Sequence, residues 1–173
     1  SSTDPGTSLP IVIAATIFLD VTPPALSLNP VTSPTGRSSQ LISGAAEPVA
    51  TVSVAVNGGA PVPANRTGAL FSAQISGFVD GLNIISATAT DPAGNVTTAT
   101  ADVTVILPTG DIDGGGVSLS DVLKALHMAV GIETATAAQY FRCDVAPLGA
   151  PDNRIDVSDA LLILKKAAWL ANF

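Results

Sequence analysis

The sequence is poor in cysteine, histidine, aromatic residues and positive charge. Its 173 residues include one cysteine, Cys143, and one histidine, His127, and only 4% are aromatic. A single cysteine excludes both an intrachain disulfide and a Cys-x-x-Cys-His haem attachment. Seven Lys and Arg stand against 14 Asp and Glu, which gives a net charge of −7. We therefore expect no binding to nucleic acids, because the chain has no basic stripe to displace counterions from phosphates.

Arrangements for catalysis and for crossing a membrane are also lacking. One histidine allows no clear Ser/His/Asp arrangement, and Cys143 has few groups that could activate it as a nucleophile. The longest apolar run, Leu9 to Leu19, is shorter than the roughly 20 residues that a transmembrane helix needs. The sequence thus predicts a protein that is not an enzyme and has no transmembrane segment.

Small and β-branched residues, separated by turns, are abundant. Hydrophobic residues make up 47% of the chain, with 15 Gly and 13 Pro. This composition favours a β-sandwich with small side chains in its core. From Ala25 to Leu107 we expect strands at residues 25–29, 40–45, 51–57, 70–75, 83–90 and 96–106. The clearest hairpin turn is Asp91-Pro92-Ala93-Gly94-Asn95, where Pro presets φ and Gly tolerates a positive φ.

These strands and turns resemble bacterial Ig-like repeats. The similarity lies in residues 26–35, 40–44 and 87–95, and the Asp91–Asn95 turn is its most specific part. It covers about half of the chain and implies an immunoglobulin-like antiparallel β-sandwich. Such repeats occur in tandem on bacterial surface and secreted proteins, so the resemblance implies an extracellular or cell-surface location.

The N-terminal segment Leu9 to Val21 is apolar on both faces of a predicted strand. Residues Ala15 to Pro24 resemble the last strand and linker of a preceding repeat, similar to Ala101 to Pro108 at the end of the sandwich. Exposing its Ile, Val and Phe side chains would cost on the order of several kcal/mol. We therefore expect residues 1–24 to carry a strand donated to a neighbouring subunit, which gives head-to-tail self-association into a filament or surface layer.

After a short linker at residues 107–110, the apolar period becomes helical. We expect helices at residues 118–131, 136–141 and 158–170, with Gly131 ending the first of them. The first and third helices each follow an Asp-rich loop. Aligned on Asp121 and Asp159, the two loops form an internal repeat, and the apolar residues Val117 and Ile155 are expected to pair in a short β-bridge.

Both loops have the carboxylates and tight backbone that calcium prefers. In the first loop the expected ligands are Asp111, Asp113, a carbonyl of Gly115 or Gly116, Ser118 through a water, and Asp121. In the second they are Asp144, the carbonyl of Ala146, Asp152, the carbonyl of Arg154, Asp156 and Asp159. The first loop is one residue short and the second has an insertion, Pro147 to Pro151. Four carboxylates make the second loop the stronger candidate. The alternative is that these Asp residues are turn and N-cap residues.

Two bound Ca²⁺ would change the net charge from −7 to −3. Neither loop ends in the bidentate Glu of sensor EF-hands, so we expect a structural ion that stabilises a small helical domain. The tandem of Asp-rich loop and helix, from Thr109 to Phe173, resembles the dockerin module. That resemblance implies docking onto a cohesin-like partner through the helices. The residues to test are Ser120, Leu123 and Leu126 with their repeat mates Ser158, Leu161 and Leu164.

The expected organisation is an N-terminal strand at 1–24, an Ig-like sandwich at 25–107 and a dockerin-like calcium-binding domain at 108–173. The leading functional hypothesis is a non-catalytic extracellular structural subunit, stabilised by calcium and assembled by strand donation. One alternative is a dockerin-type binding module in a surface or secreted complex. Another is an intramolecular clasp in which the two halves of the chain pack on each other.

Overall fold

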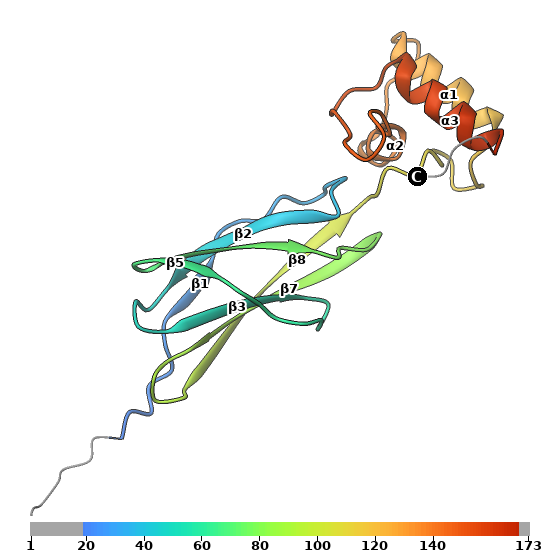
Figure 1. Ribbon diagram of the computed structural model, residues 1–173. Helices are drawn as coiled ribbons and strands as arrows, with labels where there is room; N and C mark the ends of the chain where they lie inside the picture. Colours follow the sequence, from blue (N-terminus) through green and yellow to red (C-terminus); the bar gives the residue numbers. More distant parts are fainter. Residues whose placement is uncertain (1–18, 170–173) are drawn as a thin grey trace, which may run out of the picture.

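The computed structural model describes residues 19–169. Within this range the chain is mainly β, with strands at one end and three helices at the other (Figure 1). The predicted N-terminal strand, Leu9 to Val21, lies almost wholly outside the described residues. Its last residues, Leu19 to Val21, are in no strand, and both Leu19 and Val21 are exposed. No helix among the described residues is long and apolar enough to cross a bilayer.

The strands form two four-stranded antiparallel sheets, as the prediction of an Ig-like sandwich requires. One sheet has the order β1 (Leu26–Leu28), β2 (Ser39–Ala46), β6 (Leu70–Ser76), β5 (Asn65–Thr67). The other has the order β4 (Val62–Pro63), β3 (Thr51–Val56), β7 (Gly81–Thr90), β8 (Val96–Val105). An isolated parallel bridge joins Thr35 to Val105.

The sandwich core consists of inward-facing residues that alternate along the strands, many of them small. Close packing of the strands explains one glycine. A Cβ at Gly44 would lie 2.1 Å from the Ser27 carbonyl oxygen and 2.7 Å from the Phe71 ring. Any larger residue at this position would push β1 and the ring away. The buried members of the core are Ile42, Ala46, Ala50, Val52, Val54, Phe71, Ala73, Ile75, Phe78, Ile85, Ala87, Ala89, Val103 and Val105.

The predicted hairpin turn joins β7 to β8. The Asp91 carboxylate accepts hydrogen bonds from the backbone and side-chain nitrogens of Asn95, each at 2.8 Å. Gly94 has a φ of +91°, which glycine adopts without steric cost. This turn confirms the sequence-based prediction and fixes the register of the two longest strands.

Each helix begins with a capping box. The N-cap residues of α1 (Leu119–Ala129), α2 (Ala137–Cys143) and α3 (Val157–Ala167) are Ser118, Thr136 and Asp156. Gly131, with a φ of +75°, follows the end of α1, as predicted. α1 and α3 lie side by side (Figure 1). They enclose a second core, whose buried members are Ile112, Val122, Ala125, Met128, Cys143, Val145, Ala160 and Ile163.

The two halves of the molecule meet at α2 and the linker. The Arg142 guanidinium forms an ion pair with Asp80 at 2.6 Å and donates to the Leu107 carbonyl oxygen at 3.2 Å. The Gly110 N–H donates to the Arg142 carbonyl oxygen at 2.8 Å. Asp80 also accepts from the Leu107 N–H, so a loop of the sandwich, the linker and α2 share one set of contacts. These contacts leave the outer faces of α1 and α3 exposed.

Candidate metal centre

Asp121, in the first turn of α1, is the central side chain of the first loop. It is fully buried. One of its carboxylate oxygens accepts from the N–H groups of Ile112, at 2.7 Å, and Asp113, at 3.3 Å. The other accepts from Ser118 through both its N–H, at 2.9 Å, and its hydroxyl, at 2.8 Å. A single carboxylate thus ties both ends of the loop to the start of the helix.

Asp111 holds the glycine-rich part of the same loop. Its two oxygens accept from the N–H of Gly114 at 2.7 Å and of Gly116 at 3.1 Å. Gly114 and Gly116 have φ values of +86° and +87°, which explains why the sequence has glycine at these two positions. Gly116, a predicted carbonyl ligand, therefore lies within the loop that Asp111 shapes.

Asp113 is the exposed carboxylate of the first loop. It accepts from the Gly115 N–H at 3.2 Å and the Ser120 hydroxyl at 2.8 Å, and it pairs with the Lys124 ammonium at 3.4 Å. The hydrogen bond from Ser120, followed by the contacts of Gly115 and Lys124, lowers the pKa of this carboxyl. Asp113 is therefore ionised at neutral pH.

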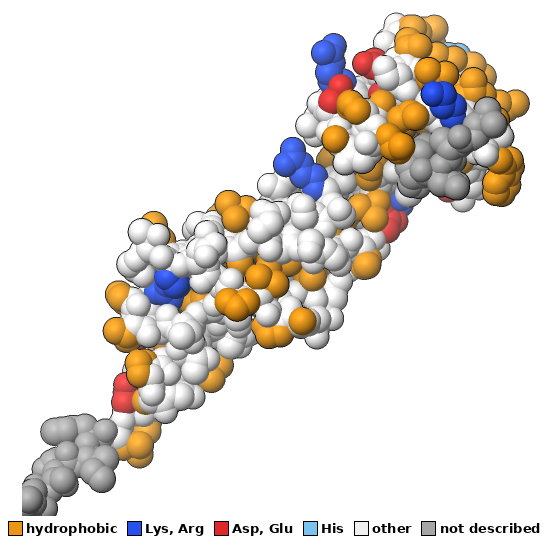
Figure 2. Space-filling model, viewed as in Figure 1, with side chains coloured by type: hydrophobic (Ala, Val, Ile, Leu, Met, Phe, Trp, Pro, Cys, Tyr) orange, Lys and Arg blue, Asp and Glu red, His pale blue; other side chains and the backbone are white. Residues whose placement is uncertain are grey.

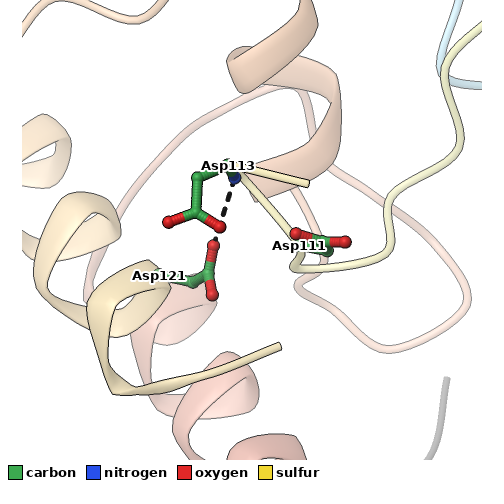
Figure 3. A group of neighbouring side chains, drawn as sticks. All are labelled: Asp111, Asp113 and Asp121. Carbon is green, nitrogen blue, oxygen red and sulfur yellow. Dashed lines mark hydrogen bonds between the residues drawn. The ribbon is translucent and has the colours of Figure 1, made fainter. Parts of the chain in front are cut away.

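Three carboxylates of the first loop form one group. Asp111, Asp113 and Asp121 each offer an oxygen, and these oxygens lie within 4.8 Å of one another (Figure 3). The group lies beside a cleft of about 630 Å³, which Asp111 and Asp113 line together with Arg142 and Lys166. Oxygens at such separations suit a hard divalent cation, and Asp111 and Asp113 face the cleft from which an ion could enter.

The second loop repeats the same hydrogen-bonding plan around two buried carboxylates. Asp159, at the start of α3, accepts from the N–H groups of Val145 and Ala146, both at 2.8 Å, and from the Asp156 N–H at 2.9 Å. Asp144 accepts from the N–H groups of Asp152 at 3.2 Å and Asn153 at 2.9 Å. Asp159 therefore corresponds to Asp121, and Asp144 to Asp111.

The remaining predicted ligands of the second loop point to local partners. Asp152, which is exposed, accepts from the Arg154 N–H at 3.0 Å. Asp156 is the N-cap of α3 and accepts from the Ser158 N–H at 2.7 Å. Among residues 19–169, the first loop is where three potential ligand side chains converge, and the second loop has no such group. The sequence ranked the second loop higher, whereas the carboxylates gather in the first.

Burial makes the carboxylates of the second loop costly to ionise. It raises the pKa of Asp144 to about 6, with further contributions from the charges of Asp159 and Asp152. Burial also raises the pKa of Asp159. The neighbouring Cys143 thiol has a pKa of about 12, because it is buried beside these acids. Cys143 therefore stays protonated at neutral pH.

The repeat extends to the apolar residues that precede the helices, but not in the expected way. Val117 and Ile155 do not form the predicted β-bridge, and the isolated bridge of the described chain is at Thr35 and Val105. Both side chains instead pack against the helical core. The prediction was wrong because the buried carboxylates already hold each loop to its helix, so the loops need no ladder between them.

The outer face of the two helices is apolar and exposed. Figure 2 shows hydrophobic side chains gathered over the helical end. Residues related by the repeat are exposed to similar degrees: 55% and 50% for Leu123 and Leu161, and 36% and 39% for Leu126 and Leu164. Further exposed apolar residues of this end are Leu119, Val130, Ile132, Val157 and Trp169. A monomer rarely exposes so many neighbouring apolar side chains without a partner.

No family model matches this chain, and no curated protein matches it. Solved structures with some similarity include fibronectin(III)-like modules of CbhA from Clostridium thermocellum, at 20% identity and a TM-score of 0.39, over 47% of this chain and 95% of that one. CopC from Methylosinus trichosporium OB3b is 14% identical, with a TM-score of 0.33, over 47% of this chain and 93% of that one. A polysaccharide lyase is 17% identical, with a TM-score of 0.35, over 61% of this chain and 14% of that one.

Proposed function

We propose that the chain is a non-catalytic extracellular structural module whose dockerin-like, calcium-binding helical end docks a protein partner. The exposed apolar face of α1 and α3 carries this proposal, because the leucines predicted for docking are all at least 36% exposed. The Ig-like sandwich then serves as the body that holds this end away from the rest of the assembly (Figure 1).

Calcium is the ion that we propose for both loops, and the converging carboxylates of the first loop support it more strongly than those of the second. In the first loop Asp111, Asp113 and Asp121 would hold it, with a carbonyl such as that of Gly116. In the second loop the holders would be Asp144 and Asp159, with Asp152 and Asp156 and the carbonyls of Ala146 and Arg154. The bound ion supplies positive charge that offsets the repulsion among carboxylates and the cost of burying them. Its role is to keep α1 and α3 aligned.

A flat apolar surface on a partner β-sandwich is the occupant that fits this face. α1 and α3 have 11 residues each, so each presents about 16 Å of helix. Two such helices side by side make a broad surface rather than a groove, which matches the face of a sheet better than a single helix. A cohesin-like sandwich has this shape and chemistry.

Binding to a cohesin-like sandwich tests the proposal directly. The full chain with calcium is expected to bind it in isothermal titration calorimetry. The double variant Leu123→Asp, Leu161→Asp is expected to bind at least tenfold more weakly. The matched control is Leu82→Asp, since Leu82 is an exposed leucine of the sandwich at 63%. Equal binding by both variants, or no binding by the unmodified chain, would refute docking through this face.

Strand donation is the second candidate function, and it is favoured by the position of the segment that leads into the sandwich. Residues 19–24 extend from the end of the sandwich opposite the helices (Figure 1). Leu19 is 81% exposed and Val21 is 68% exposed, so this part of the predicted strand is not covered by its own sandwich. A strand leaving one end can reach a neighbour without obstructing the helical end.

Light scattering of the full chain, and of a variant lacking residues 9–21, tests strand donation. The full chain is expected to form large particles and the variant to be monomeric. A full chain that is itself monomeric at high concentration would rule this candidate out. Docking by the helical face would be unaffected by that result.

A further inference from the structure

β8 has a strand partner on one side and an open edge on most of the other. It pairs along its whole length with β7. On its outer side the segment around Thr35 covers only the C-terminal end, where the Thr35 N–H donates to the Thr104 carbonyl oxygen at 3.0 Å and the Ile106 N–H donates to Thr35 at 2.9 Å. Near the start of β8 the contacts come from side chains: the Thr97 hydroxyl donates to the Pro24 carbonyl oxygen at 2.6 Å, and the Asn95 amide donates to the Asp20 carbonyl oxygen at 3.1 Å. β1 packs against β8 from the other sheet, but within the described chain no strand is hydrogen-bonded to the outer side of residues 96–102.

The exposure of the inward-facing side chains shows which part of β8 is not covered by other residues. In β7 the inward residues at 83, 85, 87 and 89 are all 0% exposed. They pair across the sheet with residues 103, 101, 99 and 97 of β8. Val103 is also 0% exposed, but Ala101, Ala99 and Thr97 are only half-buried. The change occurs where the segment around Thr35 ends, so the inner face of β8 itself is only partly covered at residues 97–101.

The chemistry of the edge suits an added strand. Residues 104 and 106 use their backbone groups on the outer side, and alternate residues of a strand point the same way. Val96, Thr98, Thr100 and Asp102 therefore direct their N–H and C=O groups outward. Asp102 is the single charge among residues 96–105, and the edge has no Pro or Lys of the kind that blocks strand pairing.

We propose that the open edge of β8, residues 96–102, accepts residues 11–19 of a second copy of the chain as an added strand. This inference rests on the strand donation proposed above and names its acceptor. The donor segment ends at Leu19, the first described residue. Both faces of this predicted strand are apolar, and it includes three Ile and one Phe. Its large side chains complement the small, half-buried side chains of Ala99 and Ala101. Main-chain hydrogen bonds and apolar burial together drive such pairing.

Two single substitutions in the full chain test the acceptor and the donor separately. Thr100→Pro removes an outward N–H that the β7 ladder does not use, so the strand is kept while its open edge is blocked. Thr100→Val leaves the edge intact and is the matched control. Ile13→Pro blocks the donor. We expect the unmodified chain and Thr100→Val to assemble in light scattering, whereas Thr100→Pro and Ile13→Pro remain monomeric.

Mixing the two blocked variants gives the decisive measurement. Thr100→Pro can donate but not accept, and Ile13→Pro can accept but not donate. Their equimolar mixture should therefore form a heterodimer and nothing larger. A mixture that stays monomeric, or Thr100→Pro that assembles as Thr100→Val does, overturns β8 as acceptor. If Ile13→Pro is monomeric in that case, strand donation itself stands. If the unmodified chain is monomeric, or if Ile13→Pro assembles, the result contradicts both strand donation and the choice of β8 as acceptor.

Hydrogen exchange keeps the inference testable if Thr100→Pro does not fold. In the unmodified chain the amides of Thr98, Thr100 and Asp102 should exchange at least tenfold more slowly after assembly. The amides of Ala99 and Ala101, which face β7, serve as the internal control and should change little. Unchanged exchange at Thr98, Thr100 and Asp102 in the assembled state would also overturn the proposal.

Discussion

The two halves of this molecule are stabilised by different means. Among the described residues, the sandwich core has 14 buried apolar side chains and the helical core has eight. The helical end also buries Asp121, Asp144 and Asp159 around its small core. Burying charge is expensive unless an opposite charge or hydrogen bonds offset it. We therefore expect the sandwich to fold without an ion and the helical end to depend on compensation of its carboxylates.

Removal of calcium should show the largest difference in stability between the two halves. In excess chelator at pH 7.5 we expect the helical circular dichroism signal to fall sharply while the β signal persists. The Cys143 thiol, fully buried in the helical core, should then react with a thiol reagent at least tenfold faster. The sandwich contains no cysteine, so the thiol reports on the helical end alone. Unchanged helicity and reactivity would show that this end needs no metal.

A cavity in the sandwich should destabilise the sandwich alone, and by an amount that does not depend on calcium. Ile85→Ala removes a fully buried side chain and is expected to lower the free energy of unfolding of the sandwich by about 2–5 kcal/mol. The loss should be the same with calcium and with chelator, measured by urea denaturation of the β signal. Ile84→Ala, at a neighbouring residue that is 47% exposed, is the control and should cost much less. A calcium-dependent loss would mean that the halves fold as one unit.

Acid should partly replace calcium. In chelator, Asp144 has a folded-state pKa of about 6, above its ordinary value of 3.8, so its protonated form stabilises the fold. That contribution, up to about 3 kcal/mol, is fully present below pH 3.8 and is lost as the pH rises through 6. Helicity in chelator should therefore decline from pH 4 to pH 7. Asp144→Asn should flatten this decline. If helicity declines equally steeply in that variant, the pH dependence comes from other titratable groups.

Breaking the junction should have the smallest effect on stability. Asp80→Asn removes the charge that pairs with Arg142, and both side chains are partly exposed, so we expect a loss of about 0–1 kcal/mol. The variant should instead widen the distribution of angles between the halves in small-angle X-ray scattering. Asp102→Asn, on the exposed face of β8, is the control. The Phe141 ring of α2 also lies close to Gly36 of the sandwich, where a Cβ would come within 2.9 Å of the ring. An unchanged distribution would mean that this contact and the linker suffice.

The sandwich was largely predictable from the sequence, because alternation and turn chemistry act locally. All six expected strands are present, with ends that differ by a few residues. β4 and β5 were missed, since each has two or three residues and β4 contains Pro63. Their positions depend on distant contacts, such as those of Arg66 in β5 with the carbonyl oxygens of Ala46, Glu47 and Ala50. No local pattern indicates these contacts.

The Asp-rich loops were predictable as positions but not as a network. Spacing identified Asp111, Asp113 and Asp121, and the structure brings these three together. Spacing did not indicate that Asp144 and Asp159 accept several backbone N–H groups each. The ion pair of Asp80 with Arg142 was not predicted either, because it joins residues 62 positions apart in different halves of the chain.

The bridge of Thr35 with Val105 has a mechanical consequence. The chain enters the sandwich at one end and leaves it through β8 at the other (Figure 1). The Thr35 segment and β8 run parallel, so tension on the two ends of the sandwich would slide these segments past each other. The hydrogen bonds of Thr35 with Thr104 and Ile106, and of Ser33 with Thr104, would then share the load and break together rather than one by one. This is a shear geometry, which resists pulling, and it would let the structural module proposed above carry tension from one end to the other.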